Sequence, residues 1–319
     1  MLALTLMLTP AGASAQSLAS FRFQVDNDWF DFWQRSVDRP DILYTAGQGF
    51  SMVFDAAPKW ARFGHQNCTA AIRDTTATSG CVQSFAGAFQ YVYTPVEDSP
   101  MPVRGDRPYA GLLQGKFGAR LARPRQLNSL ALVLGTTGYP SGAEAAQKAF
   151  HKWADLRHPM GWPYQVATQP VVGLMPEIQY MLTPPRVERR SAATVAASAS
   201  ATATTIQVGA NAGLEIHAGL NAPHPWMPTS LHERRRIRAY GILGANESWV
   251  LRDALIEGNS DATRGLVEKK PFVFQYVWGF AMGGGGYFIE YRAINMTRDY
   301  ETGRWHRWGA ISLIVGNPY

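Results

Sequence analysis

The sequence contains no run of eighteen consecutive apolar residues, and this absence excludes a membrane-spanning helix. It is also poor in charge, because Asp, Glu, Lys and Arg make up only 17% of the 319 residues, whereas aromatic residues make up 12% and glycine occurs 30 times. Length alone allows two small domains or one large β domain. A closed antiparallel β-barrel is the remaining structure that crosses a bilayer with its backbone groups satisfied, and we predict an all-β fold of this kind.

Cysteine is scarce, with only Cys68 and Cys81 in the whole sequence. They bracket a stretch rich in Thr, Ser and Gly, and two thiols are too few ligands for a metal site. In an exported protein we expect a disulfide that pins one loop. Two free thiols are the alternative.

The first residues lack the basic region with which a secretory signal begins, but the rest of a signal is present. An apolar core from Leu2 to Leu8 is followed by Ala13-Ser14-Ala15, which fits the A-x-A pattern of a cleavage site. We therefore predict a signal peptide over residues 1–16 and a barrel domain over residues 17–319. A start further upstream would explain the missing basic residues, and a buried N-terminal strand is the alternative interpretation.

The net charge of +6 is not gathered into a nucleic-acid motif. The basic residues are scattered, apart from Arg234-Arg235-Arg236 and Arg238. A phosphorylated, anionic glycolipid explains the charge equally well, so we expect no nucleic-acid partner.

Twelve segments carry the weak signature of barrel strands, in which residues of alternating character are separated by turns and aromatic residues lie near the membrane interfaces. They are residues 21–25, 49–54, 85–93, 111–121, 130–135, 176–182, 193–208, 212–220, 237–243, 271–280, 287–294 and 308–315. About twelve strands is an even number, as single-chain bacterial barrels require. The Ala/Thr/Ser tract from Ser191 to Thr205 also resembles a flexible linker, although its β-branched residues favour a strand, and both interpretations stay open.

One segment predicts a helix instead. Ser141 can serve as the N-cap with Glu144 three residues later, which is the capping-box pattern, and Pro159 follows the run of helix-forming residues. Ala143, Gln147 and His151 are spaced by four and therefore share one face. We expect this face to press His151 against the barrel wall.

His151 and a few oxygen-bearing residues could together hydrolyse an ester. Histidine is the usual base, because its ordinary pKa of about 6.5 lets it accept a proton near neutral pH. Asn27 and Asp28, which we place at the start of the first strand, offer oxygen ligands for a hard cation such as Ca²⁺, and Thr45, at the end of the second strand, could complete the cluster. Taken alone, the histidine could equally be a hydrogen-bonded structural residue, and Asp26-Asn27-Asp28 a turn. A serine nucleophile is disfavoured, because the chain has no Gly-x-Ser-x-Gly motif.

Seven sequence blocks occur in the order found in the outer-membrane lipid A 3′-O-deacylase family, and the chain resembles that family over almost its whole length. The blocks are Asp26-Asn27-Asp28, Tyr44-Thr45-Ala46-Gly47, residues 105–111, residues 142–151 with Trp162, residues 257–260, residues 267–273 and residues 295–300.

The resemblance implies a barrel in the outer membrane of a Gram-negative bacterium, with the helix on the extracellular side. It implies hydrolysis of ester-linked acyl chains of lipid A, the glycolipid of lipopolysaccharide. Asn27, Asp28, Thr45 and His151 would surround a Ca²⁺-dependent site like that of a secreted phospholipase A2, with His151 as the base and with Asn27 and Asp28 on the metal. We expect the barrel to be a monomer.

The sequence departs from the family at two acidic positions, which are Arg157 and Gln169 here. Asp155, four residues after His151, could orient the imidazole in place of the lost carboxylate. A catalytically silent barrel with a lipid-binding or structural role is therefore the alternative function. A small pore is disfavoured, since we expect Phe272, Phe274 and Tyr276 to help fill the lumen.

The family's pair of adjacent basic residues is also absent, because residues 96–99 read Val-Glu-Asp-Ser. Arg104 and Arg107 are the nearest candidates for binding a phosphate of the substrate, since arginine suits bidentate contact. The block from Asp106 to Tyr109 can also be interpreted as a structural turn, in which Pro108 presets its φ angle.

Overall fold

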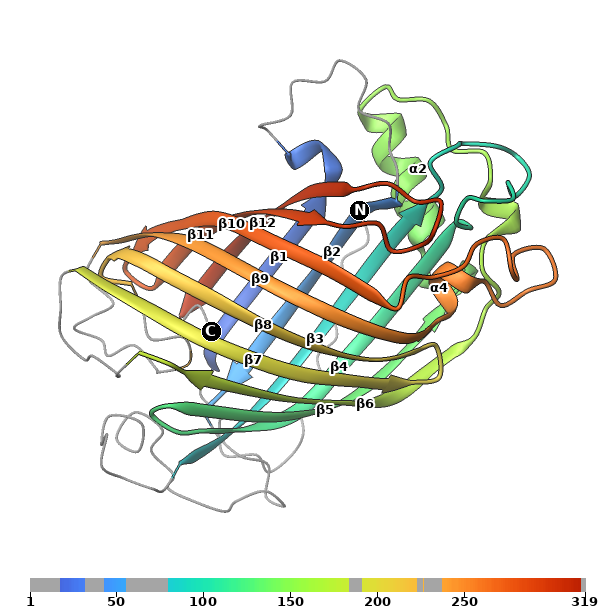
Figure 1. Ribbon diagram of the computed structural model, residues 1–319. Helices are drawn as coiled ribbons and strands as arrows, with labels where there is room; N and C mark the ends of the chain where they lie inside the picture. Colours follow the sequence, from blue (N-terminus) through green and yellow to red (C-terminus); the bar gives the residue numbers. More distant parts are fainter. Residues whose placement is uncertain are drawn as a thin grey trace, which may run out of the picture.

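The computed structural model describes residues 18–31, 43–55, 80–183, 191–222, 226 and 237–316, which form one closed antiparallel barrel of twelve strands (Figure 1). The strands are β1 (Leu18–Asn27), β2 (Leu43–Phe54), β3 (Cys81–Thr94), β4 (Ala110–Ala122), β5 (Gln126–Thr137), β6 (Pro170–Met181), β7 (Ser191–Thr204), β8 (Gln207–Leu220), β9 (Arg238–Asp253), β10 (Phe272–Gly284), β11 (Tyr287–Met296) and β12 (His306–Gly316). Each predicted segment overlaps one of them, so the predicted fold is confirmed.

Each strand pairs with the next along the chain, and β12 returns to pair with β1 from Ser20↔Gly316 to Asn27↔Gly309. This closure leaves no strand edge open. We call the end at Ser20 and Gly316 the terminal end, and the opposite end the loop end. The loop end carries α2 (Ala143–Trp153), α4 (Ala254–Glu257) and the short 3-10 helices η1 (Asp28–Phe30), η3 (Tyr139–Ser141) and η4 (Trp162–Tyr164).

The Ala/Thr/Ser tract forms a strand, so the strand interpretation is confirmed and the linker interpretation is wrong. The predicted segment was nevertheless too long at its C-terminal side. Thr204 Oγ1 accepts from the backbone N–H of Gln207 at 2.9 Å, which closes a tight turn before β8 begins. Because the side chains here are small and the turn has only two residues, the alternation pattern alone does not show where the strand ends.

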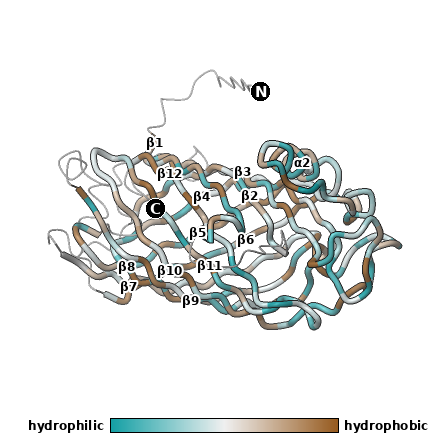
Figure 2. The backbone as a smooth tube through the Cα atoms, turned by 90° about the horizontal axis from the view of Figure 1, so that it is seen from above, coloured by the Kyte–Doolittle hydropathy of each residue, from teal (hydrophilic) through white to brown (hydrophobic). Residues whose placement is uncertain are grey.

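The outer face of the barrel is apolar. Leu130, Leu132 and Leu134 of β5 are exposed, whereas the alternate residues Ala131 and Val133 are buried. Figure 2 shows the same change between hydrophobic and hydrophilic residues along the strands. This alternation is typical of strands with one face towards lipid and the other towards a polar lumen.

Charged residues pair with one another inside the lumen, and our prediction that Phe272 and Phe274 help to fill it was wrong. Phe272 and Phe274 of β10 are exposed on the outer face, because the two-residue period places them together but does not say which face is internal. Inside, Glu290 accepts from Arg22 at 3.0 Å and from Arg292 at 2.8 Å. The chain of ion pairs continues across the lumen to β8.

Two predicted features fall partly or wholly outside the described residues. The predicted signal peptide, residues 1–16, lies wholly outside them. Cys81 is buried and disulfide-bonded, while Cys68 lies outside the described part of the chain. Among the described helices, none is long and apolar enough to cross a membrane.

Candidate active site

The site residues expected from β1 lie at the loop end of the barrel. Asn27 is the last residue of β1 and the N-cap of η1, and Asp28 follows it, so both stand at the end of the strand and not at its start. Asp26 accepts a hydrogen bond from Tyr44 Oη at 2.8 Å and borders the cavity inside the lumen. Because successive side chains of a strand point to opposite faces, Asn27 is turned to the outer face of the wall.

Thr45 lies in a β-bulge near the start of β2, and not at the end of that strand as we expected. The register of β2 against β3 shifts between Tyr44 and Ala46, so Thr45 is the extra residue. It is buried, and its hydroxyl shares a hydrogen bond of 2.7 Å with the hydroxyl of Thr94. Bulges re-aim side chains next to functional sites, and here Thr45 and Asn27 line the same cavity of about 130 Å³.

The other side of this cavity is formed by α2. The helix contacts β3 and β4 and lies outside the barrel wall (Figures 1 and 2). Its buried face consists of Ala143, Gln147 and His151, as their spacing predicted. Gln147 lines the cavity directly, and His151 is one turn further along the same face. The structure thus brings Asn27 and Thr45 together beneath the helix that carries His151.

Two hydrogen bonds and one glycine hold α2 close to the wall. Gln90 Nε2 of β3 donates to the carbonyl oxygen of Ser141 at 2.6 Å, and the indole N–H of Trp162 donates to Gln147 Oε1 at 2.8 Å. At Gly111 of β4, an added Cβ would collide with the side chain of Ser141. Glycine is therefore required at position 111 for this approach.

The predicted capping box at the start of α2 is wrong. The N-cap is Gly142, whose φ of 70° is left-handed, and no side chain caps the helix there. Ser141 belongs to η3, although its Oγ still accepts from the N–H of Ala143 at 3.3 Å. Glu144 accepts from Lys148 Nζ at 2.6 Å. The 3-10 turn before the helix moves its start by one residue.

His151 is oriented by the main chain. Its Nδ1 lies 2.5 Å from the carbonyl oxygen of Arg157. Because a carbonyl oxygen can only accept, Nδ1 carries the proton, and Nε2 is the basic nitrogen of the neutral imidazole. The orienting role that we gave to Asp155 therefore belongs to a backbone atom. Asp155 itself is exposed beyond the end of the helix, with a φ of 54°.

Asp98 supports this arrangement, and sequence analysis missed its role. Its Oδ1 accepts from the backbone N–H of Met160 at 2.9 Å and from Tyr109 Oη at 2.6 Å. The first bond fixes the segment that follows Arg157, whose carbonyl oxygen orients His151. No local pattern would have linked Asp98 to this segment, since it lies in the connection between β3 and β4.

The two residues that replace acidic positions have separate surroundings. The side chain of Arg157 is exposed, so only its backbone contributes to the bond with His151. Gln169 joins two connections at the loop end: its Oε1 accepts from Asn259 Nδ2 at 2.9 Å, and its Nε2 donates to the carbonyl oxygen of Thr205 at 3.2 Å. Gln169 is thus a structural bridge.

Arg104 and Arg107, the candidate phosphate ligands, lie in different environments. Arg104 is exposed in a turn. Arg107 is buried, with Nη1 at 3.2 Å from Asp299 Oδ2 and its guanidinium 4.6 Å from the centre of the Tyr93 ring. Burial raises the pKa of the Asp299 carboxyl, and the Arg107 guanidinium acts in the opposite direction. Arg107 therefore fits the structural interpretation of its block, and phosphate binding by either arginine stays a prediction.

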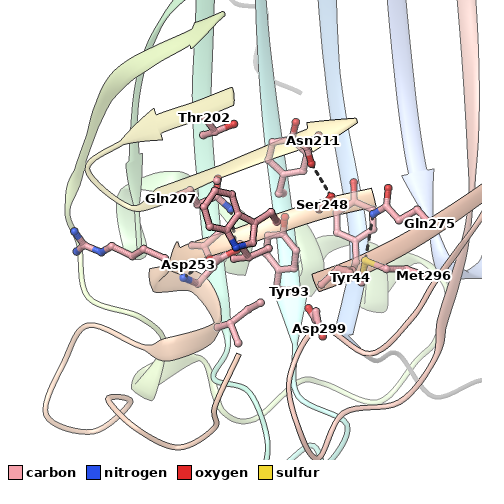
Figure 3. A pocket seen from close by; sticks show the side chains of 18 of the residues that line it. Tyr44, Tyr93, Thr202, Gln207, Asn211, Ser248, Asp253, Gln275, Met296 and Asp299 are labelled. Atoms are coloured by element: carbon pink, nitrogen blue, oxygen red, sulfur yellow. Dashed lines mark hydrogen bonds between the residues drawn. The ribbon is translucent and has the colours of Figure 1, made fainter. Parts of the chain in front are cut away.

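A second cavity, of about 360 Å³, lies inside the barrel at the loop end (Figure 3). Its polar side chains bond to one another: Ser248 Oγ donates to Asn211 Oδ1 at 2.6 Å, and Gln275 Nε2 lies 3.2 Å from Met296 Sδ. The barrel wall lies between this luminal cavity and the one under α2; Tyr44 lines the luminal cavity alone, and Asp26 borders both.

Comparison with known proteins found one family and solved barrels with similarity to this chain. The family model described as "Outer membrane protein LpxR" matches residues 1–316. Among solved structures, LpxR from Salmonella typhimurium is similar at 16% sequence identity with a TM-score of 0.72, covering 93% of this chain and 99% of that chain. The β domain of the Bordetella autotransporter Brka has 7% sequence identity and a TM-score of 0.43, covering 94% of this chain and 99% of that one. No curated protein matches the sequence.

Proposed function

This chain belongs to the LpxR family of outer-membrane proteins, and from that membership we propose that it is a hydrolase that removes ester-linked acyl chains from lipid A. The observation that carries the proposal is the oriented His151, held on the outer side of the barrel wall next to the cavity that Asn27 and Thr45 line. A site on the outer wall can meet a membrane lipid laterally. A site in the lumen would need an opening through the wall.

In the proposed reaction, His151 Nε2 takes a proton from a water molecule as the water oxygen attacks the ester carbonyl carbon. The protonated imidazole then returns the proton to the departing alkoxide, so that an alcohol and a carboxylic acid are released. The carbonyl of Arg157 holds the imidazole throughout, because its bond to Nδ1–H is retained in both protonation states.

We include Ca²⁺ as a proposed cofactor, held by Asn27 and Asp28 with Thr45 nearby. The donors fit a hard cation, since all are oxygens, and Asp31 Oδ2, at the end of η1, is buried and accepts no hydrogen bond. The described residues contain no group of three His, Cys, Asp or Glu that could hold a metal, so amide, hydroxyl and water oxygens would complete the shell. When bound, the cation would polarise the ester carbonyl.

The catalytically silent alternative rests on the loss of carboxylates at Arg157 and Gln169. The main-chain bond to His151 supplies the orientation that a carboxylate would give, so the hydrolase is favoured.

Mass spectrometry of lipid A incubated with the purified barrel tests the proposal. We expect lipid A to lose the mass of one hydroxyacyl or acyloxyacyl group. This change should not occur after chelation of Ca²⁺ or with the Asp28→Ala variant. Lipid A of unchanged mass, with Ca²⁺ present and a folded barrel, would establish the silent alternative.

A further inference from the structure

The cavity under α2 has an apolar interior. Its apolar lining residues are Val25, Phe30, Ala46, Val92, Ala146 and Phe150. Among its polar residues, Gln48 donates to Gln90 at 3.0 Å, and Gln147 accepts from Trp162. Because these amides already have hydrogen-bond partners, the space between them suits a hydrocarbon group.

Val25 and Gln48 line the cavity, and the same outer face of β1 and β2 continues two residues further to Phe23 and Phe50. Phe23 and Phe50 are cross-strand partners, and both are exposed on the outer face. Phe23 lies four residues from Asn27, which is about 13 Å at about 3.3 Å per residue. Half of a bilayer's hydrocarbon core is about 15 Å thick, so this phenylalanine pair lies at the depth that the acyl chains of one leaflet occupy when the site is at the membrane surface.

Phe150, which lines the cavity, packs against two tryptophans. Phe150 packs edge-on against Trp29, with ring centres 6.0 Å apart, and lies 5.9 Å from the ring of Trp153. Trp29 is 41% exposed and Trp153 is 80% exposed. Tryptophan at such positions is typical of the zone between lipid headgroups and acyl chains.

Building on the proposed function, we propose that this cavity receives the acyl chain of the ester that is cleaved. The chain passes from Asn27 and Thr45 between α2 and the wall, and leaves over Phe23 and Phe50 into the leaflet. A cavity of about 130 Å³ is close in size to the cavity of about 150 Å³ that accepts benzene, so it holds about five or six carbon atoms. Ala146, on the helix side, sets its width and thereby selects for acyl length.

The first test compares Ala146→Leu with a matched control, Ala145→Leu. Ala145 is exposed on the same helix, so both changes carry the same small effect on helix propensity, but only the first fills the cavity. We expect Ala146→Leu to lower hydrolysis of a dodecanoyl ester roughly tenfold, the effect of displacing about two methylene groups, and to leave hydrolysis of an acetyl ester unchanged. The control should leave both rates unchanged. Equal effects on both esters, or no effect on either, would overturn the proposal.

A second test needs no catalysis and therefore separates this inference from the proposed function. A dodecanoate carrying a diazirine midway along its chain is added to vesicles that contain the barrel, and crosslinks are mapped by mass spectrometry. We expect crosslinks to α2 and to the loop-end half of β2 that disappear in Ala146→Leu and persist in Ala145→Leu. The same crosslinks in both variants would show that the chain bypasses the cavity. Crosslinks as expected without hydrolysis would refute the hydrolase and retain the acyl site.

Discussion

The inner face of the barrel and the outer wall under α2 both carry polar side chains, but they use them differently. In the lumen, charges pair with one another: Arg292 bonds both Glu290 and Glu215, and Glu215 also bonds His217. Under α2, the polar groups frame a cavity beside an oriented histidine. The comparison teaches that the number of charges does not locate a site in a barrel. What distinguishes the proposed site is a histidine whose Nδ1 is bonded to the main chain on the helix that covers a cavity.

The largest effect that we expect comes from His151→Asn. Removing the proposed base should lower the deacylation rate roughly a hundredfold to ten-thousandfold, the usual contribution of a positioned acid–base group. Heat-modifiable migration on gels should stay as in the parent, because the barrel does not depend on this side chain. Full activity in the variant would show that another residue acts as the base, and the exposed His158 is the next candidate.

A substitution in the lumen should have the opposite effect: it should lower the stability of the barrel and leave the deacylation rate unchanged. Glu290→Ala removes one carboxylate partner from each of Arg22 and Arg292, inside the barrel. Breaking a buried ion pair costs about 3 kcal/mol of unfolding free energy, so urea should unfold the variant at a lower concentration. The deacylation rate of the folded fraction should match the parent. A selective loss of activity without a loss of stability would mean that the lumen takes part in the reaction.

Asp98→Ala should have an intermediate effect that reaches the site indirectly. Without the bonds to Met160 and Tyr109, the segment that presents the carbonyl of Arg157 loses its support. We expect the maximal rate to fall about tenfold, the cost of a weakened hydrogen bond network near 1.4 kcal/mol, with a displaced acidic limb of the pH–rate profile. Asp98→Asn, which keeps an acceptor, should recover part of the rate. An unchanged pH profile with reduced stability would assign Asp98 a purely structural role.

Arg157→Glu should have the smallest effect. The bond to His151 uses the carbonyl oxygen, and the side chain is exposed, so we expect the rate to change by less than about threefold. A large gain of activity from an inactive parent would show instead that Arg157 silences the site, and lipid A mass spectrometry of the two proteins decides this directly.

The sequence predicted the twelve strands and the buried face of α2, because both follow from simple periods of two and of about four residues. It did not predict which face of β10 is internal, since the period is the same for either choice. It could not predict that the carbonyl oxygen of Arg157 bonds His151, because every residue carries a carbonyl group and only the folded structure shows which one lies near the imidazole. Contacts such as Arg107 with Asp299, which are 192 residues apart, likewise depend on barrel closure.

The most direct test of the account measures lipid A deacylation by three folded proteins under one condition: the parent, His151→Asn on the outer wall and Glu290→Ala in the lumen. The account predicts that the first and third proteins release acyl chains at the same rate per folded molecule, while the second is at least a hundredfold slower. If Glu290→Ala were as inactive as His151→Asn while still folded, the reaction would depend on the lumen, and a site on the outer wall would be contradicted.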